Sequence, residues 1–449
     1  MTANLRAGEN VVPLWAAVAL VVAARLLVAD AQINWDEELY FQIARYWSAE
    51  TLPYRDLFDH KPPMLFLWAK LVSGWGESMA LIRVVQTLLL FGALLLLLRQ
   101  FAGRLPLLWV VVILALLSLP ASLGTNAEII YLPMILAGLA WALAGNWAIA
   151  GIAAALAVSV KYTVALDLIG VFLVYMALAG QRSAKQLLVA AVIGFAAIQL
   201  ALYLYFWMHG IDLIEETIIR NLTHAEGSRS VYIPKTALLG FSVLGAVIGS
   251  RLVVHGRYGE RWLVAALLAW TLLSFLQSQV TGRSYAHYFV PVFVPLSILA
   301  FLDWPARTVG FFRVCIVALT AALSIGVLTL SVLSFRGDQL ARQELAGNCP
   351  DGPFQYHGGY LAAYRACDAA QPGKYFYPPF YSDLHFIGVS GSGGDRWACA
   401  LERPILIETQ TGYTSFENGQ DWCRSTMPKQ AQAFSGIRKA VRDLIGNGK

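Results

Sequence analysis

A short stretch near the start of the chain places carboxylates, cations and an aromatic ring close together. Between positions 35 and 63 these residues are Asp36, Glu37, Tyr54, Arg55, His60 and Lys61. A positioned carboxylate can take the proton of an attacking hydroxyl group. Cations can neutralise a phosphate as it leaves, and an aromatic ring can cover the apolar face of a sugar. The set therefore suits the transfer of a sugar from a lipid phosphate.

The elements that carry these residues can be predicted from local spacing. Leu39 and Ile43 recur at helical spacing, which predicts a short helix that begins at Asp36 and lies on a membrane surface. Taken alone, Asp36 could be only a helix N-cap, and Glu37 could be favoured there only by the helix dipole. Residues 52–56 and 60–63 predict two turns, and the prolines of the second turn hold Lys61 in an extended segment. Catalysis is indicated by the whole set and not by Asp36 alone.

The rest of the chain is that of an integral membrane protein. Of its 449 residues, 58% are hydrophobic and only 14% are charged, and the mean hydropathy is +0.58. A soluble domain carries roughly 25% charged residues. The low charge and the repeated apolar runs indicate a polytopic helical protein in a lipid bilayer. The net charge of +5 is modest and no basic run stands out, so nucleic acid is not expected as a partner.

Apolar run lengths predict about eleven membrane spans. They lie near residues 11–29, 79–98, 105–120, 128–144, 146–160, 163–179, 187–206, 236–254, 262–280, 286–302 and 314–335. Arginine and lysine gather in the connections at 99–104, 181–185, 257–261 and 303–313. By the positive-inside rule these connections and the N-terminus face the cytoplasm. The loop 30–78 and the C-terminal segment would then face the periplasm, in a bacterial inner membrane.

The first apolar run also fits a secretory signal peptide, because Ala29-Asp30-Ala31 resembles a cleavage site. The run is long for such a segment and many spans follow it. An uncleaved first helix is therefore the preferred interpretation.

The segment 336–449 predicts a small periplasmic α/β domain after a transmembrane domain at 1–335. It contains Cys349, Cys367, Cys399 and Cys423, which is an even number of cysteines in an exported segment. Disulfides are expected, and three pairings are allowed. Residues 403–408 predict a strand, and residues 437–445 an amphipathic helix. The domain could be a lid or acceptor-docking domain, or only a structural cap.

The loop residues also resemble a known family. Asp36-Glu37 after the first span, followed by Pro53-Tyr54-Arg55-Asp56 and His60-Lys61-Pro62-Pro63, is similar to the first outer loop of GT-C glycosyltransferases. The protein O-mannosyltransferase-like family is the most similar, with its bacterial relatives that include lipid A aminoarabinose transferase. Supporting resemblance covers roughly residues 10–335. It includes Arg83, the segment 125–128 and the segment 282–291.

The resemblance implies an all-α GT-C fold and an inverting transfer from a polyprenyl-monophosphate sugar. It implies that Asp36 is the catalytic base and that Glu37 is the second member of the acidic pair. It places Glu128 as a second outer carboxylate that orients a substrate, and Lys61 and Arg283 near the donor phosphate. The acceptor would be a glycan, a glycolipid such as lipid A, or a protein.

Several residues outside the loop have both a functional and a structural interpretation. Glu128 could orient a substrate or only begin a helix. Lys161 could reach the phosphate from an outer turn. His287 could contact substrate or be an ordinary interface histidine. Asp167 could pair with Lys161, make another structural polar contact or line a cavity. The histidines are scattered, so we expect no required metal and no cofactor.

Two other function classes remain open at this stage. One is a polysaccharide polymerase or ligase that uses a diphosphate-linked donor. The other is a transporter or flippase of a lipid-linked sugar, which needs charged or broken helices at mid-membrane. Only Asp167 meets that requirement in the sequence.

Overall fold

A computed structural model describes most of the transmembrane part and a few pieces of the C-terminal segment. The described residues are 12–33, 35–101, 104–119, 123–179, 184–220, 233–255, 260–280, 285–303, 310–346, 348–349, 355–357, 363–367, 405–409 and 412–416. The chain divides into two compact units. The first consists of Met1–Trp47 and Asp59–Gly337, and the second of Ser48–Phe58 and Asp338–Lys449.

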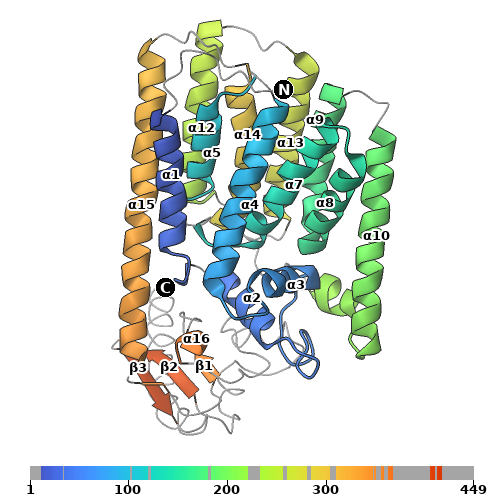
Figure 1. Ribbon diagram of the computed structural model, residues 1–449, viewed down its shortest axis with the longest axis vertical. Coiled ribbons are helices and arrows are strands. Elements are labelled where there is room, and N and C mark those ends of the chain that lie inside the picture. The colour runs from blue at the N-terminus through green and yellow to red at the C-terminus, as the bar shows by residue number, and fades with distance from the viewer. Residues whose placement is uncertain are drawn as a thin grey trace, which may run out of the picture. The chain divides into compact units, whose positions relative to one another are not determined.

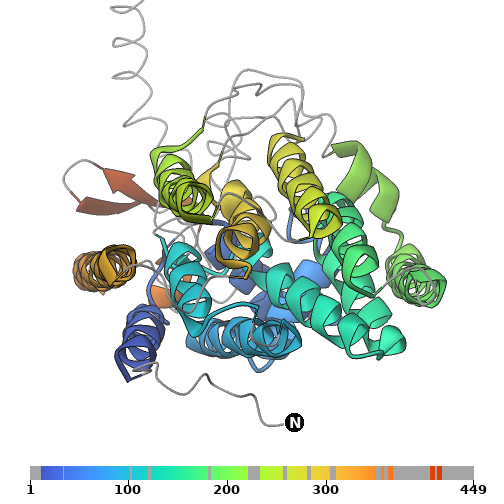
Figure 2. The same cartoon turned by 90° about the horizontal axis from the view of Figure 1, so that it is seen from above.

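The first unit is a bundle of apolar helices, seen from the side in Figure 1 and end-on in Figure 2. Its long helices are α1 (Val12–Leu27), α4 (Met79–Gln100), α5 (Leu107–Leu116), α7 (Ala127–Leu143), α8 (Trp147–Val160), α9 (Ala165–Ala179), α10 (Ala184–Met208), α12 (Lys235–His255), α13 (Arg261–Gln279) and α14 (Val290–Phe301), and α15 (Gly310–Ala346) begins in it. Each overlaps one of the predicted spans, and α15 extends past the predicted end at residue 335 to Ala346. The all-α polytopic class is therefore confirmed.

Helix length and composition agree with a membrane setting. Within the described ranges, four segments are long and apolar enough to cross a bilayer: Met79–Gln100, Tyr162–Ala179, Ala184–Met208 and Arg261–Gln279. Only 11% of the most apolar stretch of α10 is buried inside the protein. On this helix the side chains of Val192 and Ile193 are 58% and 63% exposed. A helix that is apolar on its exposed face is suited to contact with lipid chains.

Small residues allow neighbouring helices to approach closely, as is common in membrane bundles. At Gly151 on α8, an added Cβ atom would lie 2.5 Å from the Cβ atom of Ala190 on α10. At Gly170 on α9, it would lie 2.6 Å from Trp270 on α13. Even an alanine at either position would force these helix pairs apart.

Two short helices lie at one end of this bundle, which we call the site end (Figure 1). They are α2 (Trp35–Tyr46), which confirms the helix predicted at Asp36, and α3 (Pro63–Val72). Pro63 occupies a first-turn position of α3, where its missing N–H costs nothing. Lys70 of α3 donates to the carbonyl oxygens of Ala44 (3.1 Å) and Trp47 (2.7 Å). These bonds tie the C-terminus of α2 to α3.

The described part of the second unit contains helix α16 (Ala363–Ala366) and strands β1 (Gln355–His357), β2 (Ile405–Thr409) and β3 (Gly412–Phe416). Strand β2 pairs in parallel with β1 and antiparallel with β3. It overlaps the strand predicted at 403–408. The helix predicted at 437–445 lies outside the described residues.

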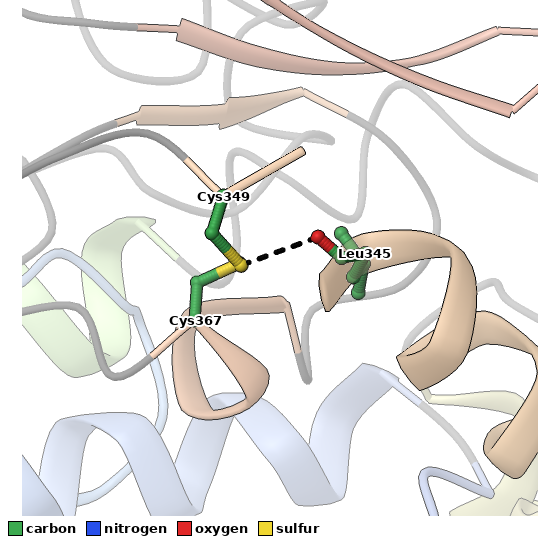
Figure 3. The surroundings of a disulfide bond; sticks show 3 residues. All are labelled: Leu345, Cys349 and Cys367. Atoms are coloured by element: carbon green, nitrogen blue, oxygen red, sulfur yellow. Dashed lines mark hydrogen bonds between the residues drawn. A yellow bond between two sulfur atoms is a disulfide. The ribbon is translucent and has the colours of Figure 1, made fainter. Parts of the chain in front are cut away.

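A disulfide in the second unit joins Cys349 and Cys367, whose Cα atoms are 5.4 Å apart (Figure 3). The sulfur of Cys349 lies 3.4 Å from the carbonyl oxygen of Leu345 in the last turn of α15. This is one of the cysteine pairs that the sequence allowed. Cys399 and Cys423 lie outside the described residues.

Candidate active site

Asp36 and Lys61 meet at the site end of the bundle, although 25 positions separate them in the sequence. Asp36 lies in the first turn of α2, and Lys61 directly precedes Pro62 and α3. The Lys61 Nζ atom is 3.2 Å from Asp36 Oδ1. Each of the two side chains is 19% exposed. The pair is therefore largely desolvated but still within reach of a substrate.

Asp59 is a second carboxylate beside Lys61, and its Oδ2 atom is 3.7 Å from Lys61 Nζ. Its Oδ1 atom accepts the backbone N–H of His60 at 2.7 Å and lies 3.4 Å from His60 Nδ1. The Asp59 side chain is completely buried. Lys61 therefore bridges two carboxylates, and His60 holds the buried one.

His287 is a further partner of Asp36 and comes from a distant part of the sequence. It lies on η3 (Ala286–Phe289), a short 3₁₀ turn before α14, and its Nε2 atom is 3.7 Å from Asp36 Oδ2. Its ring stacks on Tyr285, with centroids 5.6 Å apart. Asp36 thus has Lys61 on one oxygen and His287 on the other.

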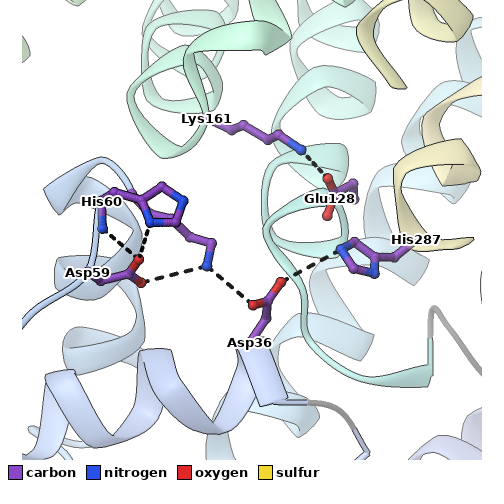
Figure 4. Close-up of polar contacts among 7 residues, drawn as sticks. Asp36, Asp59, His60, Glu128, Lys161 and His287 are labelled. Atoms are coloured by element: carbon purple, nitrogen blue, oxygen red, sulfur yellow. Dashed lines mark hydrogen bonds and ion pairs between the residues drawn. The ribbon is translucent and has the colours of Figure 1, made fainter. Parts of the chain in front are cut away.

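Glu128 and Lys161 form a second carboxylate–lysine pair near Asp36 (Figure 4). Glu128 lies in the first turn of α7, and Lys161 connects α8 to the 3₁₀ turn η1 (Tyr162–Val164). Lys161 Nζ donates to Glu128 Oε1 and lies 4.1 Å from the centre of the Tyr288 ring. Glu128 is 2% exposed and Lys161 17%. The lysine is therefore the accessible member of the pair.

The two carboxylates bridged by Lys61 differ in acidity. Burial alone raises the pKa of Asp36, but Lys61 and then His287 outweigh it, and the pKa lies below its ordinary value of 3.8. Burial dominates at Asp59 and raises the pKa of that carboxyl, with Lys61 opposing the shift. Asp36 is therefore ionised at neutral pH, which is the state that a proton acceptor needs.

Glu37 follows Asp36 in the sequence but faces a different environment. Its carboxylate is paired with Arg83 of α4, at 3.0 Å from Nε to Oε1 and 2.5 Å from Nη2 to Oε2. Both side chains are buried, at 2% and 0% exposure. This two-point contact fixes α2 on the bundle. The geometry favours a positioning role for Glu37, and a catalytic role remains a prediction.

Three residues that the sequence predicted for the site are not among the described members of this cluster. Tyr54 and Arg55 belong to the second compact unit. Tyr54 is buried there, and its backbone N–H donates to the Leu57 carbonyl oxygen at 2.7 Å. Arg55 is exposed and pairs with Asp56 at 2.7 Å. Arg283 lies outside the described residues.

Sequence reasoning missed three residues that line this cluster. The sequence did contain a signal that Asp59 belongs to the site, because this residue directly precedes His60 and Lys61. The Tyr40 ring lies 5.0 Å from Lys61 Nζ, and the Tyr288 ring covers Lys161. Cation–π contacts of this kind leave no distinctive pattern in a sequence.

Asp167 is not paired with Lys161 as one prediction allowed. It is fully buried on α9 and accepts hydrogen bonds from Trp270 Nε1 (3.2 Å), Tyr131 (3.4 Å) and Ser274. These donors are all uncharged and lie on α7 and α13. Asp167 is therefore a structural contact among three helices.

Among the described residues, no three His, Cys, Asp or Glu side chains are placed so that they could hold a metal ion. The expectation that no metal is required stays a prediction.

Comparisons with known proteins identify the fold. No protein-family model and no curated protein sequence matches the chain. Two crystal structures of ArnT from Cupriavidus metallidurans are similar to it, one bound to undecaprenyl phosphate and one in the apo state. The TM-scores are 0.62 and 0.58 at 15% and 14% sequence identity, and each match covers 89% of this chain and 93% of the other. The likeness confirms the GT-C fold that the outer-loop motif implied.

Proposed function

We propose that the protein is an inverting glycosyltransferase that moves one sugar from a polyprenyl monophosphate to an acceptor. The observation that carries the proposal is Asp36, an ionised and partly accessible carboxylate with Lys61 and Lys161 close by. A base and phosphate-binding cations in one desolvated site meet the needs of this reaction. The shared fold supports the donor class, since ArnT has been crystallised with undecaprenyl phosphate.

The reaction needs one displacement at the anomeric carbon. Asp36 takes the proton of the acceptor hydroxyl group while the hydroxyl oxygen bonds to the anomeric carbon. The bond from that carbon to the phosphate oxygen breaks, and the polyprenyl phosphate leaves with the bonding electrons. Lys61 and Lys161 neutralise the charge that develops on it. Attack from the opposite face inverts the anomeric centre.

The other site residues act around this step. Glu37 holds α2 through Arg83, and Glu128 holds Lys161. His60 and His287 fix Asp59 and Asp36. Tyr54, Arg55 and Arg283 are proposed to contact sugar or phosphate. We also propose that the protein lies in the inner membrane with the site facing the periplasm, and the lysine- and arginine-rich connections support this orientation.

Donor choice tests the proposal directly. Purified protein in liposomes is given a panel of polyprenyl-monophosphate and polyprenyl-diphosphate sugars, with lipid A, lipid-linked glycan or peptide as acceptor. We expect transfer from monophosphate donors only. Transfer only from diphosphates would indicate a polymerase or ligase, and flux of the lipid-linked sugar without transfer would indicate a flippase. Mass spectrometry of envelope glycolipids from a deletion strain would identify the sugar and the acceptor.

A further inference from the structure

A proline inside α7 leaves one backbone carbonyl group of that helix without its usual partner. In an α-helix the carbonyl oxygen of a residue accepts the N–H of the residue four positions later. Pro133 lies within α7 and has no N–H, so the carbonyl oxygen of Ile129 cannot be paired along the helix. Ile129 is completely buried, and an unpaired carbonyl group is costly where water cannot reach it. Another element must therefore supply a donor to this turn of α7.

That donor is the side-chain amide of Gln86, which lies on α4. Its Nε2 atom donates to the carbonyl oxygens of Ile129 at 2.9 Å and Ile130 at 3.2 Å. The Gln86 side chain is completely buried, and α4 is apolar and long enough to span a bilayer. A buried amide in such a helix is costly unless its polar atoms are paired. Gln86 and the turn before Pro133 therefore satisfy each other.

The oxygen of the same amide holds α3. Trp68 Nε1 donates to Gln86 Oε1 at 3.2 Å. A backbone carbonyl oxygen can only accept a hydrogen bond and an indole N–H can only donate one. These partners therefore fix which end of the amide faces α7 and which faces α3. Neither an ionised carboxylate nor an apolar side chain could satisfy both helices.

The two helices that Gln86 joins begin beside the two carboxylate–lysine pairs of the candidate active site. Lys61 of the first pair lies two positions before the start of α3. Glu128 of the second pair lies one position before Ile129 on α7. One buried amide therefore connects the helix that follows Lys61 to the helix that carries Glu128.

Arg83 supports the same arrangement from the preceding turn of α4. It lies three positions before Gln86, and residues three apart lie on the same face of a helix. Arg83 is paired with Glu37 of α2, which directly follows Asp36. One face of α4 therefore contacts α2, α3 and α7 at once.

We propose that Gln86 is a positioning residue that fixes the separation of the two carboxylate–lysine pairs, and that Pro133 makes α7 depend on it. The proposal rests on the proposed function, in which a base and two cations act on the same donor. A misplacement of about 1 Å can slow such a reaction by roughly 10²-fold. Gln86 should therefore affect turnover much more than donor recognition.

The test is Gln86→Met, which keeps the approximate length of the side chain and removes both polar ends. Sugar transfer is measured in liposomes well below the unfolding midpoint, per molecule that still binds undecaprenyl phosphate. We expect kcat to fall by about 10- to 100-fold and the donor KM to change by less than about threefold, because the lost alignment matters mainly in the transition state. A normal kcat, with or without a raised KM, would overturn the proposal.

Gln100→Met is the matched control for this test. It makes the same change at the other end of α4, about 21 Å away along the helix. Its kcat and donor KM should equal those of the wild type. An equal fall in kcat in both variants would show that any loss of a glutamine from α4 slows the protein, which would contradict a specific role for Gln86.

Pro133→Ala separates positioning from stability. It gives α7 an N–H for the Ile129 carbonyl oxygen, so Gln86→Met should lower the denaturation midpoint less in this background than in the wild type. The fall in kcat caused by Gln86→Met should remain, because α3 and α7 still lack their shared contact. Recovery of kcat together with the midpoint would give Gln86 a purely structural role and refute the proposal.

Trp68→Phe tests the contact with α3, because it removes the donor and keeps an aromatic ring. It should lower kcat by less than Gln86→Met, and the double variant should be no slower than Gln86→Met alone, since both changes break the same connection. Additive losses would show that the two residues act separately and would contradict the proposal.

The wild-type protein in the same assay distinguishes the two proposals. No transfer by the wild type would remove the proposed function and this role of Gln86 with it. Transfer by the wild type together with a normal kcat in Gln86→Met would remove the role of Gln86 alone.

Discussion

Asp36 and Glu37 are adjacent carboxylates in the first turn of α2, yet the fold gives them opposite surroundings. Glu37 is 2% exposed and meets the planar guanidinium of Arg83 at two points. Asp36 is 19% exposed and has looser contacts with Lys61 and His287, at 3.2 and 3.7 Å. Residues one apart on a helix point about 100° away from each other, so one turns into the bundle and the other toward the cluster. A tight buried pair fixes structure, and a looser accessible carboxylate can take a proton.

The sharpest test of this contrast is Asp36→Asn, which removes the proposed base and keeps the shape of the side chain. We expect the rate of sugar transfer to fall by about 10²–10⁴-fold, the usual contribution of a general base. The measurement is kcat with a saturating polyprenyl-monophosphate donor. Glu77→Gln, an exposed carboxylate in the same unit, is the control and should keep its rate. Near-normal transfer by correctly inserted Asp36→Asn protein would remove Asp36 from the mechanism.

Arg83→Met should act on stability. It leaves Glu37 buried without its cation, and breaking a buried ion pair costs about 3–5 kcal/mol of unfolding free energy. The double variant Glu37→Gln with Arg83→Met should recover much of that loss, because no uncompensated charge remains. Denaturant unfolding in detergent measures both. If Arg83→Met unfolds like the wild type, the pair does not fix α2.

Lys61→Met should change the pH dependence of transfer. Lys61 is the largest favourable influence on the Asp36 carboxylate and keeps its pKa below 3.8. In the proposed mechanism activity needs ionised Asp36, so activity is present above that pKa and is lost as the pH falls through it. Without Lys61 the pKa rises, and the acidic limb of kcat should move to higher pH. A limb that stays in place would show that Lys61 does not set the acidity of Asp36.

His287→Gln should give the smallest effect, in the same direction. His287 ranks after Lys61 among the groups that lower the pKa of Asp36, and its nitrogen is 3.7 Å from the carboxylate. The acidic limb of kcat should therefore move up by less than in Lys61→Met. A larger shift of the acidic limb than in Lys61→Met would show that His287 lowers the pKa of Asp36 more than Lys61 does.

Much of the site could be predicted because its signals are local in the sequence. Asp36, His60 and Lys61 stand in one charged loop, and the motif they form pointed to the GT-C fold. The association of Glu128 with Lys161, and of His287 with Asp36, joins segments 33 and 251 positions apart. No spacing rule connects such distant positions, so the sequence offered them only as separate candidates.

The different surroundings of Asp36 and Glu37 could not be predicted from the sequence either. Both are acidic, both suit the start of a helix, and both belong to the same motif. Their surroundings depend on how α2 rotates against α4 and α3, which is decided by packing of Leu39 and Ile43 and by the position of Arg83. Tertiary contacts therefore left Asp36 partly accessible and buried Glu37 in an ion pair.

By itself, the sequence determined the class of the protein and where its chemistry is concentrated. Run lengths of apolar residues specify spanning helices because a bilayer leaves the backbone few other ways to satisfy its hydrogen bonds. Only the tertiary structure decided which side chains meet and which cysteines pair. These depend on the packing of helices far apart in the chain, where a few small residues such as Gly151 set the distance between neighbours.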